Sequence, residues 1–438
     1  MLGNIFFSTF LVLNIVADIG RVWSWVIVVA VAFTAIMYIV RGGLKAGVVT
    51  DALQSVTMIV AAFVLWGVVW VNAGGWKGLR QKLAAIDANL PETLLHVGGY
   101  SPLGVPPYVV VFGLIVTLTM YVLINQYETI RFLGARSEWD FKMAALVASV
   151  ATAGCLWFNV SLGPLAWADF PGLEMSDQAY PLMLKKYLPT GLIGLVLAGL
   201  VAGGYSTFDS IGIGISSLFV RDIYARFIVK NGSDAHYTRV GRITVPFIIL
   251  LGFLYVPFLQ GGMVMFYLRL AGAIQVPLMT VILMGIFTRV HRGTGVIGLV
   301  VGLTYGISAI LADAQDWALP IWYTSTWWAY LWNLALPVGS MLIASKVIDL
   351  LRGSVREEEI KGLVYSKDEA TADLRELMAS RLKVLEGTWL QKTLLEAPIR
   401  PKYPFEVPET GLRWFQRPGI WAIIYLVIAC YLLFVLLW

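Results

Sequence analysis

Long apolar runs dominate this chain of 438 residues and limit what it can fold into. A helix needs ~20 mainly apolar residues to cross the hydrocarbon core of a bilayer. The runs do not alternate in polarity as membrane strands do, so they predict helices. We expect about ten full spans and one N-terminal stub, at residues 1–17 (the stub), 22–40, 52–72, 107–130, 143–166, 188–219, 241–259, 263–287, 294–312, 326–348 and 418–437.

The composition excludes several classes of protein. Charged residues make up 13% of the chain, against about 25% in soluble domains, and the mean hydropathy is +0.76. The net charge of +5 needs no nucleic-acid partner, because the basic residues lie in loops beside the apolar runs. Two cysteines, Cys155 and Cys430, predict neither a disulfide framework nor a thiolate metal site. Nucleotide-loop and zinc-protease motifs are absent from the sequence, so we expect no enzyme.

Basic residues also predict the orientation of the spans. Alternating loops place twelve of them on one side: Arg41, Lys45, Arg131, Arg136, Lys142, Arg221, Arg226, Lys230, Arg239, Arg242, Arg289 and Arg292. The other side has five, namely Lys77, Arg80, Lys82, Lys185 and Lys186. The positive-inside bias makes the first side cytoplasmic, in a multi-pass protein of the plasma or inner membrane.

Three regions follow from this division of the chain. Residues 1–345 form a transmembrane core, residues 346–417 a polar insertion on the cytoplasmic side, and residues 418–438 a C-terminal transmembrane helix. The insertion contains a stretch of helical periodicity with mixed charge. It is either a solvated helix or a segment that binds a partner or regulates the protein.

One apolar run, within residues 188–224, carries polar groups in its middle. Four residues fall at i, i+3, i+4 and i+7, on one helical face: Gly203, Ser206, Thr207 and Ser210. The face offers hydroxyl and carbonyl oxygens, which small hard cations prefer, and Gly203–Gly204 weakens the helix there. Alternatively the hydroxyls bond back to helix carbonyls in a packing face. Asp209 needs more than such packing, because ionisable groups at membrane depth are costly.

Short motifs in this segment resemble a known family. LPTGLIGL, STFDS and RDIY are similar to the signature helix of the sodium:solute symporters, which are secondary transporters of the LeuT type. Three other stretches resemble the same family in the same order, at residues 38–54, 125–142 and 283–302. The resemblance implies an all-α bundle of two inverted five-helix repeats, with ion and solute bound near the midplane beside broken helices.

The resemblance also implies a function. We expect sodium-coupled uptake of a small polar solute by alternating access, with Na⁺ as the coupling ion, no cofactor, and the lipid bilayer as surroundings. The chain corresponds to the family from inside the third core helix onward, so we expect an N-terminally truncated product. The alternative is a non-transporting membrane sensor or pseudotransporter of the same fold. Coupling to protons instead of sodium stays open.

Sodium ligands carry over from the family residue by residue. The main site takes the Gly203 carbonyl and the hydroxyls of Ser206 and Thr207. A second site, present in some members, is implied for Ser206, Asp209, Ser210 and Asp51. From the residues alone, Asp51 is either part of this ion pathway or the N-cap of a helix that Thr50 and Asp51 open.

The solute site is less well matched. The family's gating tyrosine corresponds to Tyr121, and two other ligand positions fall at Thr152 and near Arg269, where sugar-transporting members have a lysine and a glutamine. Tyr121 either contacts a solute or packs between helices. Arg269 either extends to the membrane interface or binds a carboxylate in the cavity. A sugar, an amino acid or an organic acid therefore all stay open.

Overall fold

The computed structural model describes residues 1–95, 104–128, 138–352 and 413–432, and no strand occurs among them. The long helices are α1 (Leu2–Val16), α2 (Arg21–Asn72), α5 (Pro107–Ile124), α7 (Glu138–Asp169), α9 (Thr190–Leu218), α10 (Asp234–Leu251), α11 (Met263–Phe287), α12 (Thr294–Ala314), α14 (Thr326–Arg352) and α18 (Pro418–Tyr431). Shorter ones are α3 (Gly75–Ile86), α4 (Leu90–Leu94), η1 (Ser176–Gln178), α8 (Ala179–Tyr187), η2 (Phe219–Ile228), η3 (Gly252–Gly261), α13 (Ile321–Thr324) and η5 (Trp414–Gln416).

The predicted spans are confirmed over most of the described chain. Nine helices there are long and apolar enough to cross a membrane, so the protein is a multi-pass membrane protein. The N-terminal stub is α1, with 15 residues. The described part of the last predicted span, α18, has 14 helical residues, and that span runs on beyond the described residues. Most of the predicted polar insertion, residues 353–412, also lies outside them.

Two of the predicted spans, which share the label α2, are separate helices that meet at a sharp break. The 52 residues of α2 include both runs, and Gly43 interrupts them with φ 60° and ψ −160°. Only glycine adopts this backbone region without serious strain. The two predicted spans are therefore confirmed as Arg21–Gly43 and Gly47–Asn72, and the short connection expected between them turns abruptly at Gly43.

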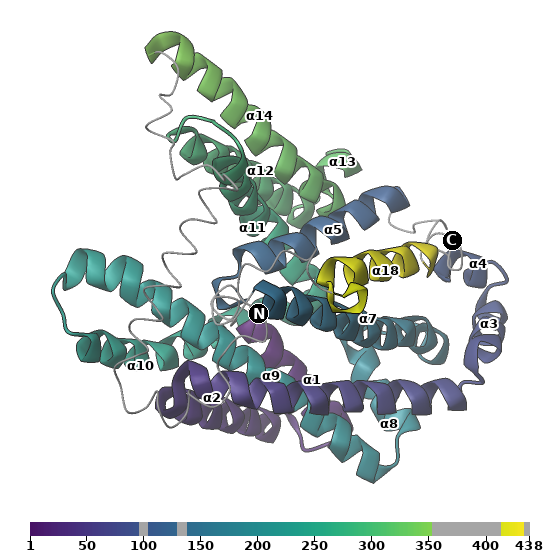
Figure 1. Cartoon of the computed structure of the whole chain (residues 1–438). Coiled ribbons are helices and arrows are strands. Elements are labelled where there is room, and N and C mark those ends of the chain that lie inside the picture. Colours follow the sequence, from purple (N-terminus) through teal and green to yellow (C-terminus); the bar gives the residue numbers. More distant parts are fainter. Residues whose placement is uncertain (96–103, 129–137, 353–412, 433–438) are drawn as a thin grey trace.

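The helices pack in two groups (Figure 1). One group joins α1, α2, α7, α8, α9 and α10, with α2 lying along α9. The other joins α5, α11, α12 and α14 around Tyr330, which is fully buried and donates a hydrogen bond to the Leu268 carbonyl at 2.9 Å. Large apolar side chains such as Phe33 and Phe247 remain exposed on the outside of the helices. A lipid environment covers such side chains at no hydrophobic cost.

A close approach between α11 and α12 depends on a glycine. A Cβ added at Gly306 would lie 2.6 Å from the Ala273 Cα, which is backbone and cannot move aside. We expect Gly306→Ala to destabilise the protein by about 1–3 kcal/mol, the usual cost of overpacking. Thermal unfolding in detergent measures the effect. Gly285→Ala is the matched control, because nothing lies within 4 Å of a Cβ there; equal midpoints for the two variants would contradict the expectation.

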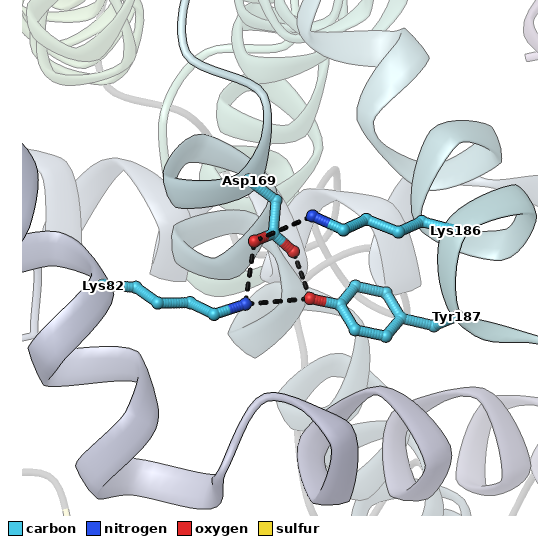
Figure 2. Close-up of polar contacts among 4 residues, drawn as sticks. All are labelled: Lys82, Asp169, Lys186 and Tyr187. Carbon is cyan, nitrogen blue, oxygen red and sulfur yellow. Dashed lines mark hydrogen bonds and ion pairs between the residues drawn. The ribbon is translucent and has the colours of Figure 1, made fainter.

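A charged cluster joins three segments at the predicted outer ends of the helices (Figure 2). Asp169, at the end of α7, has a side chain that is 5% exposed. Its carboxylate accepts hydrogen bonds from Lys82 of α3 at 2.8 Å and from the hydroxyl of Tyr187 of α8, and it forms an ion pair with Lys186 of α8 at 3.1 Å. Lys82 also donates to the Tyr187 hydroxyl at 3.0 Å. The cluster fastens both surface helices to α7.

Burial and hydrogen bonding shift two groups of this cluster. Burial alone would lower the pKa of Lys82, but its hydrogen bonds to Asp169 and Tyr187 outweigh burial and raise that pKa above its ordinary value. The pKa of the Tyr187 hydroxyl is also raised. Burial is the largest cause, and the hydrogen bond to Asp169 is the second. Both groups therefore keep their protons more firmly in the folded protein than in the unfolded chain.

Candidate functional site

The predicted cation face lies in the middle of α9, where the helix is continuous. The Thr207 hydroxyl donates to the Gly203 carbonyl at 3.0 Å, and the Ser210 hydroxyl donates to the Ser206 carbonyl at 2.6 Å. These are the hydrogen bonds to helix carbonyls that the sequence allowed as an alternative to a cation site. They use only the protons, so the hydroxyl oxygens of Thr207 and Ser210 keep lone pairs with which a hydroxyl can accept.

Gly203 and Gly204 allow neighbouring helices to come close. A Cβ at Gly203 would lie 3.1 Å from Met58 of α2, and one at Gly204 would lie 3.1 Å from Ile5 of α1. The sequence predicted that this glycine pair weakens α9, but the helix is unbroken from Thr190 to Leu218. The glycines therefore bring α2 and α1 against the hydroxyl face.

Asp209, which borders this face beside Ser206, is the most unusual polar residue of α9. It is 1% exposed, and neither carboxylate oxygen has a hydrogen-bond partner among the described residues. Its Oδ2 lies 3.5 Å from the position of a Cβ added at Gly47 of α2, so the carboxylate points at α2 just beyond the Gly43 kink. A buried charge without a partner is strongly unfavourable, and a bound cation would remove that cost.

Asp51 lies one turn after Gly47 and is half-buried on α2. Residues four apart share a helical face, so Asp51 lies on the same face of α2 as Gly47, next to which the Asp209 carboxylate lies. The two helices that carry Asp51 and Asp209, α2 and α9, pack together. The N-cap alternative for Asp51 is wrong, because the helix breaks at Gly43 and Asp51 lies two turns inside the part that follows. Thr50, expected beside it at the helix start, bonds back to the Gly47 carbonyl at 2.9 Å.

The three residues suggested for the solute lie on three different helices, α5, α7 and α11. Tyr121 on α5 packs edge-on against Tyr127, with ring centroids 6.1 Å apart. Thr152 is exposed on α7. Arg269 on α11 forms an ion pair with Asp313 of α12, and its Nε donates to Thr326 of α14 at 3.2 Å. The guanidinium is thus paired between helices of the second group, and its side chain stays 40% exposed.

A cavity of about 400 Å³ contains polar residues to which the sequence assigned no role. It lies where α1, α5, α9, α10, η3 and α11 meet, and the lining includes Asn125, Tyr127, Tyr255, Tyr267 and Gln275. The Tyr255 hydroxyl and the Gln275 Oε1 are buried there without a hydrogen-bond partner. Volumes of 300–1,000 Å³ with a few convergent polar groups are typical of small-molecule sites. The sequence signal was a polar residue inside a predicted span, which marks Asn125 and Gln275.

A second cavity, of about 350 Å³, lies between α1, α2, α7, α8 and α9 and is mostly apolar. Met58 and Gly199 line it, and both lie next to the hydroxyl face at Gly203. Asp177 also lines it, and its carboxylate accepts a hydrogen bond from the Met263 backbone at 2.6 Å. This cavity therefore adjoins the candidate cation face.

Comparisons with known proteins agree with the fold and the motifs. The sequence profile of the sodium:solute symporter family matches residues 18–302. Mouse sodium/myo-inositol cotransporter 2 is 31% identical over 321 residues, covering 66% of this chain and 47% of that protein. Zebrafish sodium/glucose cotransporter 4 is 27% identical, covering 65% and 48%. The chain thus spans about half the length of the curated relatives it matches.

One solved structure resembles most of this fold. A Na⁺-coupled sialic acid symporter in a substrate-bound, outward-open state superposes with a TM-score of 0.59 at 20% identity, over 81% of this chain and 73% of that one. The likeness supports the fold alone. Relatives of this kind are transporters and not enzymes. With its helices, its signature segment and a profile match over more than half its length, this chain belongs to the sodium:solute symporter family.

Proposed function

We propose that the protein binds sodium at the hydroxyl face of α9 and couples its inward movement to the uptake of a small, uncharged, polar solute. The observation that carries the proposal is the Asp209 carboxylate, 1% exposed in the middle of a spanning helix with no hydrogen-bond partner among the described residues. A cation is the partner that such a carboxylate lacks. Membership of a symporter family makes sodium the first candidate.

Two ligand sets are proposed around this face. The main site would use the Gly203 carbonyl with the hydroxyls of Ser206 and Thr207. The second would use Ser206, Asp209, Ser210 and, from α2, Asp51. Oxygen ligands suit a hard cation, and the Thr207 and Ser210 oxygens keep accepting capacity because their bonds to α9 carbonyls use only the protons. Asp209 gives the set its charge.

The membrane potential can supply the driving force. Moving one charge inward is worth ~2.3 kcal/mol per 100 mV, and a sodium concentration gradient adds to it. An ion that closes the site only when a solute is present converts this energy into uphill uptake by alternating access. The cell membrane, plasma or inner, is where such a potential is maintained.

The proposed solute site is the cavity of about 400 Å³ lined by tyrosines, Asn125 and Gln275. No charged side chain is among its described lining residues, so a charged solute would be desolvated there without compensation. Arg269, the cation that could bind a solute carboxylate, does not line this cavity and is paired with Asp313. Hydroxyl and amide groups suit a polyhydroxylated solute, and the relatives named above are cotransporters of myo-inositol and glucose.

Reconstitution tests the proposal directly. The full chain in liposomes should take up labelled myo-inositol or glucose when sodium is outside, and uptake should fall to the level of empty liposomes when choline replaces sodium. Uptake that follows a proton gradient and ignores sodium would refute sodium coupling. Sodium binding without uptake of any solute in a panel of sugars, amino acids and organic acids would support the sensor alternative instead.

A further inference from the structure

The segment after α9 extends past the membrane. The 29 residues of α9 are about 44 Å long at a rise of 1.5 Å per residue, and a bilayer's hydrocarbon core is only ~30 Å thick. The π-helix η2 continues directly from its end, and α10 returns after a short turn. This turn lies at the left edge of the molecule, beyond the other labelled helices of the group (Figure 1). The hairpin of residues 219–242 therefore lies at the depth of the lipid headgroups.

The hairpin carries an excess of unpaired positive charge. Its basic residues are all exposed: Arg221, Arg226, Lys230, Arg239 and Arg242. None of them forms an ion pair with any residue that the structure describes. The only acidic residues in this stretch are Asp222 and Asp234, so five basic and two acidic residues leave a net charge of +3.

Exposed apolar side chains accompany these charges. Ile223, Phe227 and Ile228 are 48%, 69% and 61% exposed. Phe227 and Ile228 follow Ile223 by four and five residues, which is about one turn of a helix with i→i+5 hydrogen bonds. The three side chains therefore share a face of η2. A positive-inside excess alone explains basic residues in a loop, but it does not require apolar side chains beside them. The combination is typical of segments that lie in the membrane interface.

Hydrogen bonds hold the hairpin in shape. The Tyr237 hydroxyl donates to the Val229 carbonyl at 2.6 Å and accepts from the Gly232 backbone at 2.9 Å, which closes the turn. The Ser216 hydroxyl of α9 donates to the Gly241 carbonyl of α10 at 2.7 Å. The charged and apolar groups are therefore displayed on a preorganised support, which lowers the entropy lost on binding.

We propose that residues 219–242 form a binding site for the phosphate-bearing headgroups of anionic phospholipids in the adjoining leaflet. Arg221, Arg226 and Arg239 contact the phosphates, since guanidinium binds phosphate oxygens with paired hydrogen bonds. Phe227 and Ile228 enter the boundary between headgroups and acyl chains. The site is separate from the proposed ion and solute sites, and it does not depend on transport.

Lipid binding to the purified full chain in a neutral detergent tests this inference. Phosphatidylglycerol should bind more tightly than phosphatidylcholine, by native mass spectrometry or lipid-dependent thermal stabilisation. Each basic residue near an anionic surface contributes a few-fold in affinity, so the variant R221Q/R226Q/R239Q should lose at least about ten-fold. The matched control is R21Q/K77Q/K185Q, which removes three exposed basic residues. Lys77 and Lys185 lie on the predicted opposite side of the membrane, and Arg21 begins a span whose other end, next to Arg41, is predicted to be cytoplasmic.

Further arms separate the possible occupants. Phe227→Ala keeps every charge and should still weaken phosphatidylglycerol binding, because a lipid uses the apolar face and a free phosphate does not. Equal losses in the two triple variants would overturn the proposal, as would unchanged lipid affinity in R221Q/R226Q/R239Q with folding confirmed by circular dichroism. Tighter binding of soluble polyglutamate than of phosphatidylglycerol would assign the surface to an acidic protein partner and also overturn it.

Discussion

Asp209→Asn should abolish sodium-dependent uptake, with a loss of at least about 100-fold, while the variant remains folded. Asparagine has the same shape and keeps one acceptor oxygen, but it lacks the charge that the proposed ion neutralises. Removal of an unpartnered buried charge, 1% exposed, relieves a desolvation cost. The variant should therefore unfold at a higher temperature than the parent in sodium-free buffer, a combination that simple loss of structure would not give.

Thermal unfolding provides the second readout. A ligand that binds only the folded state stabilises it by about 2.7 kcal/mol at one hundred times its Kd. The parent should gain stability from sodium chloride and not from choline chloride, and Asp209→Asn should gain none. Asp316→Asn is the control, because it removes an exposed carboxylate and should leave the sodium response intact. A sodium response preserved in Asp209→Asn would contradict the proposed role of this carboxylate.

Most of the architecture could be predicted from hydropathy, because a bilayer imposes a length on every spanning helix. The predicted runs at residues 263–287 and 294–312 agree with α11 and α12 to within two residues. The two spans on either side of Gly43 were predicted in the same way, but the abruptness of the turn between them was not. How tightly two spans are connected depends on neighbouring helices, here α9 packing along α2.

The site was only partly predictable. Helical spacing placed Gly203, Ser206, Thr207 and Ser210 on one face of α9, and their ligand roles stay predictions. Arg269 shows the limit, because its partner Asp313 lies on another helix and no local pattern indicates the pair. The same holds for Asp169, whose partners come from two further segments. Long-range pairs require the tertiary arrangement, and a single sequence does not supply it.

Asp169→Asn should destabilise the outer ends of α3, α7 and α8. The substitution leaves Lys82 and Lys186 close together without the carboxylate that both contact at 2.8 and 3.1 Å. Breaking a buried pair costs about 3–5 kcal/mol, but the lysine side chains are 33% and 40% exposed, so solvent screening reduces the loss to about 2 kcal/mol. Hydrogen exchange should show α3 opening more readily, together with a lower thermal midpoint.

The control is a neighbouring ion pair between α3 and α4, Arg80 with Glu92 at 2.7 Å, whose side chains are 46% and 65% exposed. Glu92→Gln should change stability by less than about 1 kcal/mol.

Alkaline pH gives an independent check, because the pKa values of Lys82 and Tyr187 are raised in the folded protein. Their stabilisation is complete below the unfolded values of 10.5 and 10.0 and is lost as pH rises through the folded values. The parent should therefore lose stability above about pH 10 more steeply than Asp169→Asn, and parallel curves would show that the cluster does not fasten these helices.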